Sequence, residues 1–157
     1  MSVHDRLSQL LADVPHERLE HPAVQSAAHA AELRGTPARI GGKALVMKLK
    51  KDFAILALGG DARLDGRQLR KTLGVQRYRM ATREELLQLA GLTPGSVPPI
   101  GRPLFPLPLF MDQGLAQQTH IAFTLACPTV SAILTMPDYL ALARPDAVVP
   151  LTAPQDR

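Results

Sequence analysis

The sequence predicts an α+β domain built around a mixed β-sheet. Stretches with helical and with strand periodicity intermix irregularly, without the strict strand–helix repeat of a parallel α/β fold. The sequence also lacks the glycine-rich phosphate loop that would indicate a doubly wound nucleotide-binding sheet. A length of 157 residues suits one domain, and an aromatic content of only 4% predicts a core of aliphatic side chains.

The first third of the chain predicts a helix, a strand and a second helix. Ser2 and Asp5 form a variant of the capping box and leucines at helical spacing follow, so we expect a helix over residues 3–12. The stretch "HERLEH" alternates like a short strand and ends before Pro22. The alanine-rich stretch "AVQSAAHAAELRG" favours a helix that ends at Gly35.

The middle of the chain predicts a pair of strands and two capped helices. "ARIGGKALVMKLKKDFAILALGG" predicts two strands that are joined near Lys51. Asp65 is a candidate N-cap for a helix that ends at Gly74, and a capping box at residues 82–85 begins a helix that ends at Gly91. Between these helices, "VQRYRMA" predicts a short strand.

The last third begins with a proline-rich segment. Six prolines between residues 94 and 108 exclude a regular helix or a central strand, so this segment is either a rigid structural loop or one wall of a site. "HIAFTLACPTVSAILTM" predicts two strands around Cys127, and Pro137 suits the first turn of a last helix. We therefore expect a single domain over residues 1–144 and an extended, proline-rich tail over 145–157.

Composition and charge limit the partners, the compartment and the cofactors that we expect for this protein. The net charge of +4 permits binding to nucleic acid or another polyanion without establishing it. Cys127 is the only cysteine, which excludes an intrachain disulfide and fits a reducing compartment. We expect a cytoplasmic protein with no membrane partner, because the sequence has neither a signal peptide nor a long apolar run. Histidines and Cys127 lack metal-ligand spacing, so we expect no metal and no organic cofactor.

Lys43 occupies an unusual position at the start of a predicted strand. In strand periodicity it shares a face with the apolar residues Leu45, Met47 and Leu49. One interpretation is a strand-end lysine whose stem lies on apolar surface while its ammonium group reaches water. The other is a functional cation that faces a pocket.

A basic cluster follows the predicted pair of strands, and it also has two interpretations. It is either a solvated helix face beside Asp61 and Asp65, or a surface that contacts a phosphate backbone without reading bases. DNA binding through this helix would need a helix-turn-helix pair, which the sequence does not show. Cys127 is interpreted as a small packing residue, since nothing fixes a base beside it. The cluster comprises Arg63, Arg67, Arg70, Lys71, Arg77, Arg79 and Arg83.

Several stretches together resemble the YbaK/ProX family of aminoacyl-tRNA deacylases, whose domain also occurs as the editing insertion of bacterial prolyl-tRNA synthetases. "HERLEHPAVQSAAHAAELRG" is similar to the family's opening strand and helix, and "GGKALVMKLKKDFAILALGGDARLDGRQLRKTLG" to its lysine-led strand, hairpin and helix. "RYRMATREELLQLAGLTPGSVPPIG" resembles the segment that leads into a glycine-x-x-x-proline loop, here residues 95–99. "MPDYLAL" is similar to the closing helix, so the likeness runs over residues 16–143.

The resemblance implies a mixed, partly barrel-like sheet and a trans-editing activity. The reaction would hydrolyse the ester of a small mischarged amino acid, such as alanine or cysteine, on the acceptor end of a proline-type tRNA, with help from the substrate itself. An aminoacyl-tRNA synthetase is a possible partner. The implied roles are catalysis for Lys43; substrate binding for His21, Ala44, Gly95, Ser96, Val97, Pro98, Pro99, Ala126, Cys127 and Thr129; and contact with the tRNA backbone for Arg67, Arg70 and Lys71.

The sequence departs from the family's pattern at two places. The loop "LACPTVS" has no glycine where the family usually carries several, and Ala44 stands where threonine often follows the lysine. Side chains then project where bare backbone would approach the ligand. The alternative to an enzyme is therefore a module that has kept the fold, lost the activity, and binds tRNA, a nucleotide or a partner protein.

Overall fold

The computed structural model describes residues 1–153, and residues 154–157, the end of the predicted tail, lie outside the described part. Among residues 1–153 no helix is long and apolar enough to cross a membrane. The elements run in the order α1 (Val3–Leu11), β1 (Glu17–Glu20), α2 (Ala27–Arg34), the short 3-10 helix η1 (Ala38–Ile40), β2 (Gly42–Leu49), β3 (Asp52–Gly59), α3 (Gly66–Leu73), β4 (Tyr78–Met80), α4 (Arg83–Ala90), β5 (Leu109–Asp112), α5 (Gln113–Ala116), β6 (His120–Thr124), β7 (Val130–Thr135), α6 (Met136–Ala143) and β8 (Ala147–Val149).

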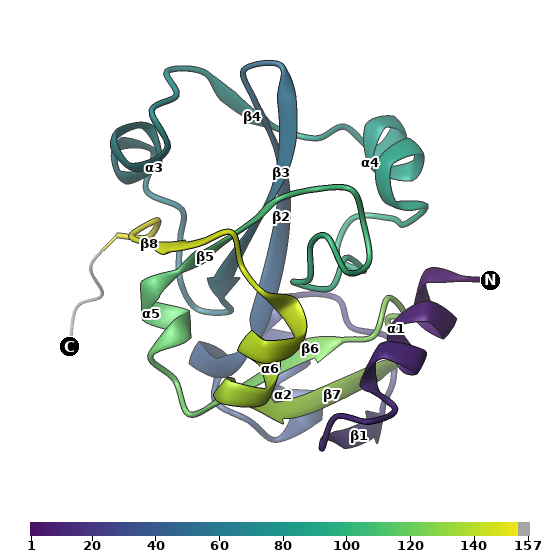
Figure 1. Ribbon diagram of the computed structural model, residues 1–157. Coiled ribbons are helices and arrows are strands. Elements are labelled where there is room, and N and C mark those ends of the chain that lie inside the picture. Colours follow the sequence, from purple (N-terminus) through teal and green to yellow (C-terminus); the bar gives the residue numbers. More distant parts are fainter. Residues whose placement is uncertain (154–157) are drawn as a thin grey trace.

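The strands form two sheets, which confirms the predicted α+β class with a mixed sheet. The larger sheet has the order β4-β2-β3-β5-β8, in which β2 pairs antiparallel with β3 and β4 while β5 pairs parallel with β3 and β8. The smaller sheet is antiparallel and has the order β1-β7-β6. A single bridge from Gly41 to Ala122 connects the two, so the strands approach one another without closing a barrel (Figure 1).

The β2–β3 hairpin is the centre of the molecule, because each of its faces packs against a separate apolar cluster. Val46 and Ile55 belong to the larger cluster, to which α1, α4, α6 and the smaller sheet contribute. Met47 and Leu56 belong to the other cluster, which Leu69 of α3 covers. Figure 1 shows α3 and α4 on opposite sides of the hairpin. The alternating side chains of β2 thus reach two different environments.

The predicted helix ends are confirmed at several points. Asp65 Oδ1 accepts a hydrogen bond of 2.9 Å from the backbone of Arg67 and begins α3. Thr82 and Glu85 form the predicted capping box at the start of α4. Gly74 ends α3 in a left-handed conformation with φ of 66°, which glycine adopts without steric cost.

The C-terminal segment differs from the prediction. It is extended over Ala147–Val149, as expected, but these residues form a paired strand of the larger sheet and not a separate tail. Strand β5 and helix α5 were not predicted at all. Leu151, beyond β8, is fully buried in the cluster under α3. The apolar residues of this segment find their partners in β5 and α3, which are distant in sequence.

Asp112, at the end of β5, holds the C-terminal segment in place. It is only 3% exposed, and its carboxylate accepts hydrogen bonds from the backbone of Leu151 (2.8 Å) and the hydroxyl of Thr152 (3.0 Å). It also accepts one from the backbone of Gly114, at 3.1 Å. A buried carboxylate that accepts several hydrogen bonds stabilises the folded state, and its loss leaves buried donors unsatisfied.

We expect Asp112→Ala to lower the free energy of unfolding by about 3 kcal/mol, because it leaves the buried Leu151 N–H without an acceptor. Urea denaturation followed by circular dichroism measures this change. Asp13→Ala, at an exposed position, is the control and should change stability by less than about 0.5 kcal/mol. Equal stability of the two variants would contradict the role of Asp112.

Candidate functional site

A cavity of about 570 Å³ lies beside the first half of β2, and we call it the β2 cavity. Its lining comes from parts of the chain that are far apart in sequence: helix α2 with the segment before it, strand β2, the residue after β3, the end of β4, helix α4, the proline-rich segment, and the β6–β7 region. The lining includes Lys43, Ala44, Arg34, Thr93, Pro94, Gly95, Ser96, Val97, Thr124 and Pro128.

The cavity exists because the β4–β2 ladder is short. Strand β4 pairs with β2 only over Met47–Leu49, and the last contact is a 2.8 Å bond from Ala81 N to Val46 O. Backbone groups of every second residue point to the same edge of a strand. The N–H and C=O of Ala44 therefore point to this same edge, where β4 has already turned away. A ligand in the cavity can reach an open strand edge, which supplies both donors and acceptors.

Lys43 lies at the end of an apolar face, as the periodicity predicts, and it lines the β2 cavity. Its ammonium group donates a 2.5 Å hydrogen bond to the carbonyl oxygen of Ala62. Burial lowers the pKa of Lys43 below its ordinary value; the carboxylate of Asp61 acts against this shift, and Arg63 adds to it. A cation that is partly removed from water interacts more strongly with an approaching negative charge.

Arg34 is a second cation in the same lining, and its role could not be predicted from the sequence. It is the last residue of α2, its Nε donates a 2.9 Å hydrogen bond to Ser131 Oγ, and it lines the cavity. Burial lowers its pKa to about 10. In sequence it looks like an ordinary basic residue in the last turn of a helix, which favours cations there. Only its hydrogen bond to Ser131 of β7 and its place in the cavity lining distinguish it.

The proline-rich segment forms the facing wall of the cavity through residues 93–97. Pro98 and Pro99 do not line the cavity but secure this wall, since the fully buried Tyr139 donates a hydrogen bond to the carbonyl oxygen of Pro99. Gly95 has a φ of 86°, a conformation that favours glycine. The wall is therefore held in place before any ligand arrives, which reduces the cost of binding.

The turn between β6 and β7 contributes less to the cavity than the sequence suggested. Pro128 lines it, whereas Ala126, Cys127 and Thr129 do not. Ala126 adopts a φ of 58°, in the left-handed region where glycine would fit without strain. The hydrogen bond with Thr129, 3.2 Å from Cys127 Sγ to the hydroxyl, lowers the pKa of the Cys127 thiol. This turn thus keeps a glycine-like backbone although glycine is missing from it.

His21 also lies outside the cavity lining. Its backbone N–H donates a 3.0 Å hydrogen bond to the carbonyl oxygen of Thr129. Its ring nitrogen Nε2 lies 2.7 Å from Ser131 Oγ, the same atom that accepts from Arg34. His21 is therefore connected to the cavity only through Ser131 and Arg34.

The cations of α3 lie away from the β2 cavity. Arg67, Arg70 and Lys71 are not part of its lining, and Arg70 instead stacks over the ring of Tyr78 with its Cζ 5.2 Å from the ring centroid. Tyr78 lines a second concave surface, which we call the basic hollow. The basic hollow has a volume of about 760 Å³ and is formed by Lys48, Lys50, Gly74, Gln76, Arg77, Tyr78 and Arg79.

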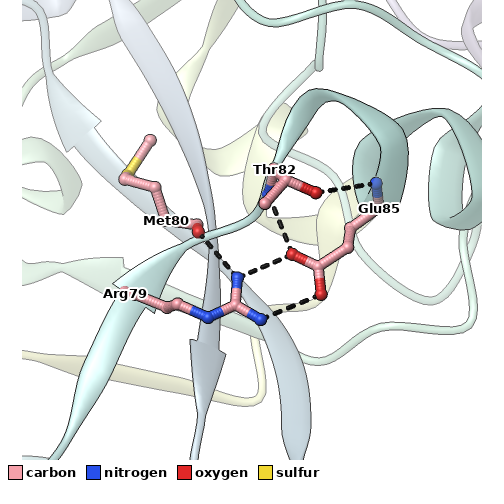
Figure 2. A network of polar contacts seen from close by, with 4 residues as sticks. All are labelled: Arg79, Met80, Thr82 and Glu85. Atoms are coloured by element: carbon pink, nitrogen blue, oxygen red, sulfur yellow. Dashed lines mark hydrogen bonds and ion pairs between the residues drawn. The ribbon is translucent and has the colours of Figure 1, made fainter.

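Charge in the basic hollow is only partly balanced. Arg79 makes a two-pronged ion pair with Glu85, with N–O distances of 2.6 and 3.0 Å (Figure 2). The hydrogen bond from Arg79 lowers the pKa of Glu85 to about 2. Within the described part of the chain, Lys48, Lys50 and Arg77 have no carboxylate within 4.0 Å. Lys48 even lies directly opposite Arg79 in the β2–β4 ladder, an arrangement of like charges that costs stability.

The described lining of the β2 cavity contains no conventional catalytic base. Among the described residues of its lining, Arg34 and Lys43 are the only side chains that carry charge, and none is Asp, Glu, His or Cys. The described residues also contain no group of three or more His, Cys, Asp or Glu side chains that could hold a metal ion. The cavity offers cations, hydroxyls and backbone groups, which suit the binding and polarisation of a polar substrate.

The comparison with known proteins agrees with this geometry. Residues 21–142 match the model of the aminoacyl-tRNA editing domain family. The chain is 33% identical over 153 residues to the multifunctional Ser/Thr-tRNA deacylase ProXp-y of Escherichia coli, with 92% of this chain and 90% of that protein covered. It is also 27% identical over 86 residues to the proline–tRNA ligase of Staphylococcus aureus, covering 55% of this chain and 15% of the ligase.

The fold is also known from experiment. A crystal structure of a candidate trans-editing enzyme for prolyl-tRNA synthetase superposes with a TM-score of 0.82 at 25% identity, covering 98% of this chain and 99% of the other. The family model spans most of the chain, and the likeness to the Escherichia coli deacylase extends over nearly its whole length. The chain therefore belongs to the aminoacyl-tRNA editing domain family.

Proposed function

We propose that this protein is an aminoacyl-tRNA deacylase that acts in trans and hydrolyses the ester between a wrong amino acid and the 3′ end of a tRNA. The observation that carries the proposal is the position of Lys43, which lines the β2 cavity together with residues 93–97. The membership of the editing family and the full-length likeness to a deacylase support it. The partial likeness to a proline–tRNA ligase supports a partnership with such a synthetase.

The reaction would proceed by addition of water to the ester carbonyl. The bond from the carbonyl carbon to the ribose oxygen breaks, the amino acid leaves as a carboxylic acid, and the ribose oxygen takes a proton. Because the described lining has no carboxylate, imidazole or thiol, the neighbouring ribose hydroxyl or the substrate's own side chain activates the water. The ammonium group of Lys43 and the open backbone edge at Ala44 stabilise the negative charge that develops on the carbonyl oxygen.

The family resemblance favours a small amino acid as the group removed, and the part of the lining that α2 and β2 contribute leaves space for it at Ala27, Ala30 and Ala44. Alanine or cysteine on a proline-type tRNA is the expectation from sequence. Two hydroxyl side chains that are nearly buried in the lining, Ser96 and Thr124, favour a substrate that carries a hydroxyl group. The name of the Escherichia coli relative points the same way. We therefore place serine and threonine ahead of alanine and cysteine.

The basic hollow is a better candidate for contact with the acceptor strand than α3. Lys48 lies five residues along β2 from Lys43, a distance of about 17 Å, which is the rise of about five stacked nucleotides, and its side chain points to the opposite face of the strand. A tRNA whose terminal adenosine enters the β2 cavity would have to cross the edge of the strand to bring the phosphates of its acceptor end near Lys48, Lys50 and Arg77. An aromatic side chain beside cations, here Tyr78, is typical of surfaces that bind single-stranded nucleic acid.

The alternative is a module that binds the acceptor end without hydrolysing the ester. The absence of a base in the lining and of glycine in the β6–β7 turn favours it. The two candidates predict the same binding surface and differ only in turnover.

Our first expectation is that the protein releases amino acid from at least one of seryl-, threonyl-, alanyl- and cysteinyl-tRNA, each charged on proline-type and on cognate tRNA. Lys43→Ala should lower kcat/KM by about a hundredfold, since it removes a charge that stabilises the oxyanion. Measurement of released radiolabelled amino acid tests both statements. Lys51→Ala, in the exposed β2–β3 turn, is the control. Tight tRNA binding without turnover on any substrate would instead support the binding module, and full activity of Lys43→Ala would exclude its catalytic role.

The second expectation concerns pH. Lys43 acts as a cation, so kcat/KM should fall as pH rises through its pKa, and burial places that fall below the ordinary lysine value of about 10.4. Arginine stays charged in this range, so Lys43→Arg should move the fall to higher pH. Rates are corrected for spontaneous ester hydrolysis at each pH. A fall that is identical in both proteins would belong to the substrate's amino group and would contradict the role of Lys43.

The third expectation separates the basic hollow from α3. The double variant Lys50→Gln/Arg77→Gln should raise KM for aminoacyl-tRNA about tenfold with kcat unchanged, and it should reduce the dependence of binding on salt. The variant Arg67→Gln/Lys71→Gln tests the α3 surface by the same assay, and Arg18→Gln/Arg39→Gln controls for net charge at exposed positions. Equal losses in all three would show that only net charge matters, and would contradict a specific surface.

A further inference from the structure

Arg34 is a partly buried cation in the wall of the β2 cavity, and no carboxylate of residues 1–153 lies within 4.0 Å of it. Ion pairs within 4.0 Å in the described part of the chain join Arg79 to Glu85 and Arg102 to Asp146, and none involves Arg34. Removal of a guanidinium group from water is costly unless an opposite charge compensates for it. The effect shows in its pKa, which burial alone lowers. A partly buried guanidinium group that lines a cavity therefore favours the binding of an anion in that cavity.

The orientation of the guanidinium is set by a chain of three hydrogen bonds. His21 Nδ1 lies 2.8 Å from the carbonyl oxygen of Pro22, which can only accept, so this nitrogen is the donor. The other ring nitrogen, Nε2, is hydrogen-bonded to the hydroxyl of Ser131 at 2.7 Å. The oxygen of Ser131 in turn accepts from Arg34 Nε at 2.9 Å. Ser131 is fully buried, so the chain is rigid and fixes the plane of the guanidinium.

Two simpler roles for Arg34 fit the structure less well. A cation at the C-terminus of a helix can bind the last carbonyl groups, but the Nε of Arg34 bonds to Ser131 of another strand. The other simple role is that of a merely packed arginine, but Arg34 lines the β2 cavity, and its Nη1 lies beside the start of β2, at an ordinary contact distance of 3.5 Å from where a Cβ atom on Gly41 would be.

We propose that Arg34 binds the phosphate group on the 5′ side of the terminal adenosine, as a subsite of the β2 cavity separate from Lys43. The proposal rests on the proposed function, because an aminoacylated tRNA end is the ligand considered. In that ligand the carboxyl group is esterified and the amino group is positive, so the phosphates are its only anions. The phosphate nearest the ester is the one on the terminal nucleoside. A guanidinium binds phosphate through two parallel hydrogen bonds, which the Nη groups of Arg34 can provide while Nε stays on Ser131.

With this subsite, the two cations of the β2 cavity have different roles. Arg34 fixes the nucleotide through a group that does not react, and Lys43 is left to act on the ester. Binding energy from a part of the substrate that does not react serves to position the reacting group. Ser131 is then a positioning residue, since it touches Arg34 and not the substrate.

The test compares AMP with adenosine as probes, by titration of the full chain followed by NMR. The two probes differ only in the phosphate, so the ratio of their dissociation constants reports that group alone. We expect AMP to bind the unmodified protein about tenfold to a hundredfold more tightly than adenosine. Arg34→Gln should remove this advantage without changing the affinity for adenosine, and Arg34→Lys should retain part of it because the charge remains.

Two further variants complete the design. Ser131→Ala should reduce the preference for AMP while leaving adenosine binding unchanged, because Nε loses its acceptor. Arg39→Gln removes the same charge from an exposed position outside the cavity lining and should leave the preference intact. Circular dichroism and thermal unfolding of each variant verify that it is folded.

The binding measurements can overturn the Arg34 subsite independently of the proposed function. No preference for AMP in the unmodified protein, or the same preference in Arg34→Gln, overturns the proposal. The readout does not depend on turnover. Preference for AMP through Arg34 without hydrolysis of any aminoacyl-tRNA would support the subsite and contradict the proposed function. Deacylation of tRNA with equal affinity for AMP and adenosine would support the function and contradict the subsite.

Discussion

The early end of the β4–β2 ladder is the feature on which the site depends. β2 pairs with β3 along its whole length, but β4 covers its other edge only over Met47–Leu49. The remaining edge opens into the cavity that Lys43 and Ala44 line. A strand edge left open is a liability for a soluble protein, because it invites pairing with other chains. Here the cavity walls restrict access to the open edge of β2, and its backbone N–H and C=O groups can bind a ligand.

Those walls are fixed by contacts that lie outside the cavity. Tyr139 holds the proline-rich segment through the carbonyl oxygen of Pro99. The segment that leads into α2 is held against the β6–β7 turn by the bond from Val24 N to Pro128 O, at 3.0 Å. Prolines lose little conformational entropy on folding, so such a wall is formed without a large cost when a ligand binds. In a site without a catalytic base, accurate placement of the substrate has to supply much of the rate enhancement.

The cations of the two concave surfaces differ in their exposure to water. Two cations, Lys43 and Arg34, are partly withdrawn from water in the cavity, where burial lowers the pKa of each. The cations of the basic hollow are more exposed, and only Arg79 among them is ion-paired within the described residues. Exposed charges attract a polyanion from a distance and are screened by salt, whereas partly buried ones act at short range on one group. The surface thus suits first the capture and then the exact placement of a nucleic acid end.

Elements whose signals are local could be predicted from the amino-acid sequence. The capping residues at the starts of α3 and α4, the glycines at their ends, the β2–β3 hairpin and the position of Lys43 on an apolar face depend on neighbours within a few residues. The family resemblance rests on the order of these same elements and is confirmed. The pairing of β8 with β5 and the burial of Leu151 could not be predicted and are seen only in the folded chain. The same holds for the contact of Arg34 with Ser131, which are 97 residues apart. Such contacts leave no periodic or capping signal, because each depends on two segments that meet only after the chain has folded.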